Sequence, residues 1–225
     1  MKICKYGITL NRLRKEDLEF VREKRNEKEA LSNDESHLEI TPEMQFEWFE
    51  SVNNFENFYY IIEYKGAKIG MLNNKKLDWS ARTSESSLFL WDESLVDTII
   101  PNLAALCLIE IGFYYLNWNV CYIRVHSDNP KAIDNAVSLG YELTEGKETV
   151  ENHLYYLTRE LFEANANKTL KDAKAFIEKE YGDGYLLLEP SDYESGIAQK
   201  IETYFIENGI NLHRKGKAGS RTYFR

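Results

Sequence analysis

The sequence predicts a mixed α/β fold, with one mixed β-sheet flanked by helices over residues 1–162 and a small α/β extension over 165–225. Three strand-like runs lie at 58–64, 68–77 and 84–91. They follow one another closely, which predicts an antiparallel meander. An apolar helix at 101–116 then leads to another strand-like run at 120–126. A strand–helix–strand run needs a crossover connection, so we expect the last two strands to be parallel and adjacent.

Local signals predict the other elements of the first 162 residues. They are a strand from residue 8, a helix over 15–25, a helix from Pro42, a helix from Pro130, and strands at 141–143 and 153–158. Thr41 and Asn129 precede these two prolines and are favoured helix caps, and Gly140 is a typical helix end. The predicted order is therefore βααβββαβαββ.

The extension has signals of its own. Residues 163–168 are polar and predict a linker, after which we expect a helix over 170–181, a strand over 185–189, a helix over 192–208 and a hairpin over 212–225. The hairpin carries several basic residues and no acidic one. It is either an anion-binding surface or an ordinary solvated one. Because fewer than about 70 residues bury little core, we expect the extension to dock on the main body or on a second copy, as in a homo-oligomer.

Composition restricts the possible functions. The chain is 43% hydrophobic and 13% aromatic, enough for a sizeable core, and its net charge is −9. Residues 1–164 hold 18 Lys and Arg against 28 Asp and Glu, which argues against nucleic acid as a partner. No apolar run reaches the roughly 18 residues of a membrane span, so we expect no membrane association. Three cysteines, two of them in apolar contexts, are typical of a reducing compartment, and we expect a cytoplasmic location.

Several motifs together resemble the GNAT superfamily of N-acyltransferases. They are Arg12 to Arg14 near the start, Arg25-Asn26, Trp48-Phe49, Ile69-Gly70, Ser127 to Ala132, and Leu139 to Tyr141. The chain is most similar to the branch that acetylates amino-sugar nucleotides and, more distantly, to the branch that acetylates ribosomal-protein N-termini. The resemblance covers about the first 160 residues and implies a sheet that splays between two parallel strands. It also implies acetyl-CoA, or another acyl thioester, as cofactor and a small-molecule amine as substrate.

The resemblance further implies roles for individual residues. The cofactor-binding candidates are Asn129, Leu90 and Asn102, and the substrate-binding candidates are Arg25, His37 and Trp48; no metal site is expected. Glu85 corresponds to a position where relatives hold a general base that acts through water, although its serine-rich surroundings equally fit a solvated strand edge. His126 lies at a strand end, where it is either an acid or base, or structural. Asn129 is either a cofactor contact or only a helix cap.

The loop from Asp92 to Asn102 departs from the GNAT pattern. Relatives place glycines and a basic or amide residue there to hold a pyrophosphate, because backbone N–H groups must approach the phosphates closely. This loop has no glycine, lysine, arginine or glutamine, and it has three carboxylates. In addition, Ala136 stands where many relatives have a tyrosine that protonates the leaving thiolate, and Gln45 stands where the sugar-nucleotide branch often has histidine.

Three functions remain open from the sequence. The first is transfer of an acetyl or other acyl group from CoA to a primary amine of a small molecule such as an amino-sugar nucleotide. The second is a degenerate GNAT-fold binding or assembly module without transferase activity. The third is an acyltransferase whose donor is an acyl carrier protein, since a carrier-borne pantetheine arm needs less of the pyrophosphate loop.

Overall fold

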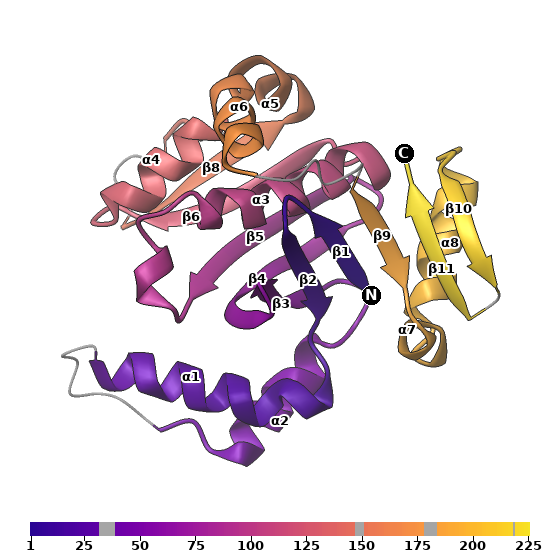
Figure 1. Cartoon of the computed structure of the whole chain (residues 1–225), viewed down its shortest axis with the longest axis horizontal. Coiled ribbons are helices and arrows are strands. Elements are labelled where there is room, and N and C mark those ends of the chain that lie inside the picture. The colour runs from indigo at the N-terminus through magenta and orange to yellow at the C-terminus, as the bar shows by residue number, and fades with distance from the viewer. Residues whose placement is uncertain (32–38, 147–150, 178–183, 218) are drawn as a thin grey trace.

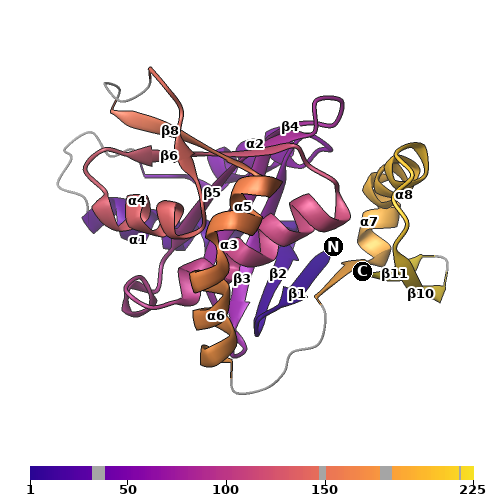
Figure 2. The ribbon, with the colours of Figure 1, turned by 90° about the horizontal axis from the view of Figure 1, so that it is seen from above.

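The computed structural model describes residues 1–31, 39–146, 151–177, 184–217 and 219–225. Its strands form one mixed sheet in the order β10-β11-β9-β1-β2-β3-β4-β5-β6-β8-β7. Helices α1 and α2 cover one face, and helices α3 to α6 lie on the other (Figures 1 and 2). The predicted mixed α/β fold is confirmed. No helix of the described ranges is long and apolar enough to cross a membrane.

The strands are β1 (Lys2–Lys5), β2 (Ile8–Arg12), β3 (Phe58–Tyr64), β4 (Ala67–Asp78), β5 (Thr83–Leu90), β6 (Val120–His126), β7 (Glu142–Leu143), β8 (Asn152–Thr158), β9 (Tyr185–Leu188), β10 (His213–Lys217) and β11 (Ser220–Phe224). The helices are α1 (Leu18–Leu31), α2 (Pro42–Val52), α3 (Ile100–Glu110), α4 (Pro130–Ser138), α5 (Arg159–Asn165), α6 (Asn167–Phe176), α7 (Pro190–Glu194) and α8 (Ile197–Glu207). A π-helical turn, Ile111–Tyr115, prolongs α3.

The predicted meander is present as β3, β4 and β5, which pair antiparallel in sequence. Gly70 lets the last two strands approach closely: a Cβ at this position would lie 2.5 Å from both Leu90 Cδ2 and the Phe89 carbonyl oxygen. Thr41 caps α2 as predicted, because its hydroxyl accepts a hydrogen bond from the Met44 N–H at 3.2 Å.

Strand β1 was not predicted from the sequence. It pairs antiparallel with β2, and Ile3 is fully buried while Lys2 and Lys5 are partly exposed. The turn between the two strands uses Tyr6 at φ 55° and Gly7 at φ 74°, as a tight hairpin turn requires. Four residues with two lysines give a weak strand signal, so the strand depends on neighbours on both of its edges.

The extension continues the same sheet, since β9 pairs antiparallel with β1 and β11 pairs with β9 (Figure 1). The linker predicted over 163–168 is wrong: α5 ends at Asn165 and α6 begins at Asn167. The single helix predicted over 192–208 is divided into α7 and α8 at Gly196, whose φ is 77°. Whether 165–225 forms a separate domain stays a prediction.

Candidate active site

A gap opens in the middle of the sheet, between β5 and β6. The two strands are parallel, as predicted, and they pair only over Thr83–Ser86 and Val120–Ile123. Beyond Ser86 and Ile123 no further pairing holds them together, so the strands separate. The backbone N–H and C=O groups that face the gap are therefore available to a ligand that lies between the strands.

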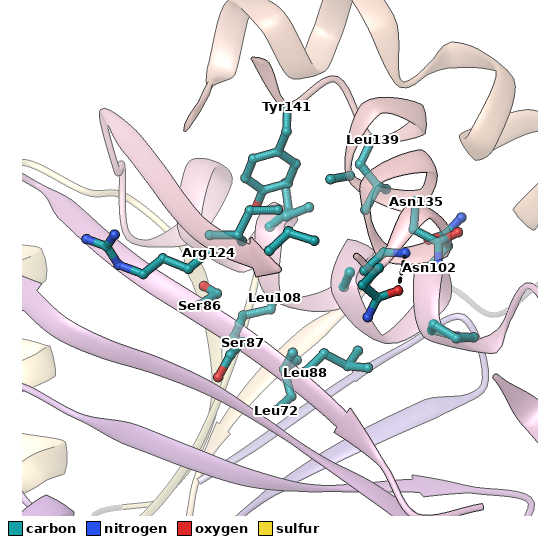
Figure 3. Close-up of a pocket in the computed structure, with 18 of the residues that line it drawn as sticks. Leu72, Ser86, Ser87, Leu88, Asn102, Leu108, Arg124, Asn135, Leu139 and Tyr141 are labelled. Atoms are coloured by element: carbon teal, nitrogen blue, oxygen red, sulfur yellow. Dashed lines mark hydrogen bonds between the residues drawn. The ribbon is translucent and has the colours of Figure 1, made fainter. Parts of the chain in front are cut away.

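A cavity of about 250 Å³ fills this gap between the strands, α3 and α4 (Figure 3). Its walls are mostly aliphatic: Leu72, Leu88, Ala105, Leu108, Ile109, Ile123, Val125, Ala132, Ala136 and Leu139. Figure 3 shows Asn102 and Asn135 on one side of the cavity, at the helices, and Ser86 and Tyr141 on the other. We call these two ends the mouth and the narrow end, because the strands rejoin at Ser86.

Two of the three predicted cofactor contacts line the cavity. Asn129 caps α4 by accepting a hydrogen bond from the Ala132 N–H at 3.1 Å, and Asn102 donates to the Ser138 hydroxyl at 3.4 Å. Both therefore lie at the mouth, next to the first turns of α4 and α3. Leu90 is only 4% exposed and does not line the cavity; Leu88, two residues earlier on the same face, does.

The acidic loop before α3 is partly neutralised by α4. Asp97 forms an ion pair with Lys131, the second residue of α4, with 2.5 Å between Oδ1 and Nζ. Asp92 accepts a hydrogen bond from the Ser94 N–H, which closes a short turn. Sequence reasoning did not single out Lys131, since its pairing spans 34 residues and only the fold brings the two helical starts together.

Glu85 lies on β5 among three cations. Its carboxylate is within 3.2 Å of Lys75 Nζ, 3.0 Å of Lys76 Nζ and 3.4 Å of Arg124 Nε. Burial alone would raise the pKa of Glu85, but hydrogen bonds and charge from Lys76 and Lys75 outweigh it, so this pKa lies below its ordinary value. In Figure 3 Arg124 extends away from the cavity. Successive strand residues point to opposite faces, so Glu85 faces the side opposite to Ser86 and α3.

His126 lines the cavity from the end of β6. Its Nδ1 accepts a hydrogen bond from the Asp128 N–H at 3.2 Å, and its Nε2 lies 2.8 Å from Glu151 Oε1. These contacts favour the tautomer with the proton on Nε2, which would then donate to the carboxylate. Both ring nitrogens are thus engaged in local contacts, and Glu85 and His126 are held by separate groups.

Two of the predicted substrate residues come together on the other face of the sheet. The Arg25 guanidinium lies 5.3 Å from the centre of the Trp48 ring and donates to Gln45 Oε1 at 3.0 Å. The Trp48 ring packs edge-on against Tyr59 at 5.1 Å. The Nε2 of Gln45, a residue only 1% exposed, has no hydrogen-bond partner among the described residues. His37 lies outside the described residues.

Comparison with known proteins identifies the fold. No protein-family model and no curated protein matches the sequence. Among solved structures, apo FdhC, described as a nucleotide-linked sugar GNAT, superposes with a TM-score of 0.64 at 19% identity, over 76% of this chain and 97% of that one. Spermidine N-acetyltransferase from Vibrio cholerae, in complex with CoA and spermine, superposes with a TM-score of 0.55 at 16% identity, over 71% and 99%. The chain has the GNAT fold.

A domain from Methanocaldococcus jannaschii is also similar, with a TM-score of 0.55 at 17% identity over 67% of this chain and 97% of that one. Each of these superpositions covers nearly all of the solved structure but only 67% to 76% of this chain. The splayed parallel pair expected of the GNAT fold is the pair β5 and β6. The cavity between them is therefore the first place to look for a ligand.

Proposed function

We propose that the protein transfers an acyl group, acetyl in the simplest case, from a pantetheine thioester to a primary amine of a small molecule. The observation that carries this proposal is the aliphatic cavity between β5 and β6, which lies where strand pairing stops after Ser86 and Ile123. A thin pantetheine arm pairs with free strand backbone there, as an added strand would. Its aliphatic segments then replace water against the cavity walls.

The donor enters at the mouth and its thioester lies at the narrow end. Asn129 and Asn102 contact the outer part of the arm, as the resemblance implies. Lys131, two residues after Asn129, is a cation at the start of α4 and is paired with Asp97. The carboxylates of the loop weaken the hold on a pyrophosphate, because like charges repel. CoA is therefore bound mainly through its pantetheine arm.

The acceptor approaches from the face that carries Glu85. Three cations around one carboxylate leave a surplus of positive charge, which favours an acceptor that bears a phosphate or carboxylate beside its amine. An amino-sugar nucleotide is such a molecule, and FdhC is described as a nucleotide-linked sugar GNAT. A polycation such as the spermine in the Vibrio cholerae complex is disfavoured by the same charge.

Deprotonation of the amine is the step that the site supports least. Glu85 is the stronger candidate for contact with the amine, directly or through water, because the cations hold it in place. Its lowered pKa makes it a weak base, however, so the acceptor must bind largely as the neutral amine. His126 serves in the reaction only after its contact with Glu151 is broken.

Calorimetric titration with acetyl-CoA tests the donor site. In Ala105→Trp an indole occupies the cavity, and we expect binding to be lost; Ala164→Trp, on the exposed surface of α5, is the matched control. Equal binding to both variants would put the donor elsewhere and contradict the proposal. If wild type binds, a panel of phosphorylated amines and spermine tests the acceptor: we expect turnover of phosphorylated amines only.

The acidic loop favours a second donor, an acyl group on the phosphopantetheine arm of a carrier protein. Such an arm carries no adenosine diphosphate. Its binding affinity is therefore reduced less by a loop that cannot hold a pyrophosphate. Comparison of acetyl-CoA with acetyl-pantetheine distinguishes the two donors. Acetyl-CoA binding at least a hundredfold more tightly would contradict the carrier-borne donor.

A further inference from the structure

The extension exposes one face of its sheet, on the side opposite to α8. On the covered side, Tyr223 packs against Phe205 of α8 with 5.3 Å between the ring centres, and Leu186 and Leu188 are buried. Figures 1 and 2 show α8 on that side of β10 and β11, and they show α1 and α2 at a distance, against another part of the sheet. No helix of the described ranges covers the opposite side of β9, β11 and β10.

Strand register places six side chains together on this uncovered side, which we call the open face. Residues that lie opposite each other in neighbouring strands point to the same side of a sheet. Tyr185 lies opposite Phe224, Leu187 lies opposite Thr222, and Thr222 lies opposite Lys215. The open face therefore consists of Tyr185, Leu187, Lys215, Lys217, Thr222 and Phe224. Its three apolar side chains are half-buried, yet they pack against neither core cluster of the described residues.

Two aromatic rings and a cation lie next to one another on the open face. The ring centres of Tyr185 and Phe224 are 6.1 Å apart, and Lys215 Nζ lies 5.5 Å from the centre of the Phe224 ring. Unpaired nucleobases stack on aromatic side chains of open sheets, and nearby cations hold the phosphates that link these bases. The open face therefore has the chemistry of a surface that binds single-stranded nucleic acid.

The charge of the hairpin favours an anionic partner. Residues 212–225 contain five Lys and Arg and no Asp or Glu, in contrast to the acidic surplus of residues 1–164. Arg221 is paired with Glu202 on the covered side. Lys215 and Lys217 are exposed, and among the described residues no carboxylate forms an ion pair with either of them. Their charge is therefore available to phosphate groups that lie along β10.

We propose that the open face binds a single-stranded segment of RNA, whose bases stack on Phe224 and Tyr185 and whose phosphates contact Lys215 and Lys217. The Thr222 hydroxyl, on the same face, is placed to meet a ribose 2′-hydroxyl, which DNA lacks. A second copy of this chain fits less well, because pairing two β10 edges would bring like charges together. This inference goes beyond acyl transfer and does not depend on it.

The experiment measures fluorescence anisotropy of a labelled uridine dodecamer with the full-length protein. A deoxyuridine dodecamer, which differs only in the 2′-hydroxyl, and a glutamate dodecapeptide are the comparison probes. Phe224→Leu removes a ring but stays apolar, and Lys215→Gln removes one cation. Phe176→Leu and Lys174→Gln are the matched controls, since both side chains are exposed on α6, on the other face of the sheet. A melting curve of each variant checks that it is folded.

At about 50 mM salt we expect wild type to bind the uridine dodecamer with a dissociation constant of about ten micromolar, and the deoxyuridine dodecamer about threefold more weakly. Phe224→Leu should weaken RNA binding about tenfold. Lys215→Gln should weaken it about threefold and lower the slope of log affinity against log salt by about 0.7, while the controls stay within about twofold.

Three results would overturn the proposal. The first is no binding of RNA by wild type, or equal binding by wild type and folded Phe224→Leu. The second is equal affinity for the glutamate peptide, which would make the open face a surface for acidic peptides. The third is equal affinity for the deoxyuridine dodecamer, which would remove the assignment to RNA.

Discussion

Glu85 and Glu110 are equally buried, at 7% exposure each, yet their surroundings differ. Glu85 lies in the sheet among three cations, of which Lys76 and Arg124 are themselves well exposed. Glu110 lies at the end of α3, where it accepts a hydrogen bond from Tyr6 and pairs with the single cation of Lys5. One cluster carries surplus positive charge and opens to solvent; the other pairs one carboxylate with one cation and borders a second cavity of about 250 Å³.

The difference shows that burial of a carboxylate does not by itself identify a catalytic group. Lys5 and Tyr6 belong to the β1–β2 hairpin, so the pairing of Glu110 attaches this hairpin to α3. That is a structural task. The cluster around Glu85 still has charge to offer to a ligand, and it adjoins the point where β5 and β6 separate. Surplus charge beside a cavity is the better indicator of a binding site.

Replacement of the two glutamates should separate these roles, and the largest effect is expected at Glu85. In Glu85→Gln the carboxylate that organises the cations is lost, and we expect acetyl transfer to a phosphorylated amine to fall about a hundredfold or more. Glu110→Gln, the matched variant, should keep its rate per folded molecule. The rate constants are measured on protein checked for folding by its melting curve. Equal losses of rate in the two variants would contradict the assignment of a functional role to Glu85 and a structural role to Glu110.

Stability should show the opposite order. Glu110→Gln leaves Lys5 without a counter-ion and weakens the contact with Tyr6, so we expect the free energy of unfolding to fall by about 2 kcal/mol. Glu85→Gln should cost less, because Lys76 and Arg124 are well exposed and water screens the repulsion between the cations that remain. Urea unfolding, followed by circular dichroism, measures both. A larger loss in Glu85→Gln would mean that its cluster is the structural one.

Local signals explain how much could be predicted from the sequence. The meander, the apolar crossover helix and the caps at Thr41 and Asn129 each depend on residues close in sequence, and the structure confirms them. Strand β1 and its pairing with β9 were missed, because they join segments more than 180 residues apart. The linker prediction failed since polar residues at 163–168 also suit the exposed surface of a helix.

The candidate site was predicted only in part for the same reason. Asn129 and Asn102 were found through the resemblance and do line the cavity. The three cations around Glu85 come from the two strands that flank β5, and no spacing in the sequence predicts that they come together.

A third carboxylate, Asp97, extends the comparison to the mouth of the cavity. The ion pair between Asp97 and Lys131 is exposed, so it contributes little stability, but it engages a cation at the start of α4, next to Asn129 at the mouth. Asp97→Asn should free Lys131 and tighten CoA about tenfold, and Lys131→Met should weaken it by a similar factor. Glu93→Gln, in the same loop, controls for the loss of negative charge alone. Calorimetry that finds Glu93→Gln as effective as Asp97→Asn would attribute the gain to net charge.

The smallest expected effect is on the pH dependence of stability. The pKa of Glu85 is lower in the folded protein than its ordinary value of 4.5, so the ionised carboxylate favours the folded state. This contribution is fully present above about pH 4.5 and is lost as the pH falls through the lower folded pKa.

Glu85→Gln has no such group. Its melting temperature should therefore fall less steeply than that of wild type below about pH 4.5, and the two curves should run parallel between pH 6 and 8. Parallel curves at acid pH as well would show that the three cations do not hold Glu85 in its ionised form, and the acceptor site would have to be sought at Arg25 and Trp48 instead.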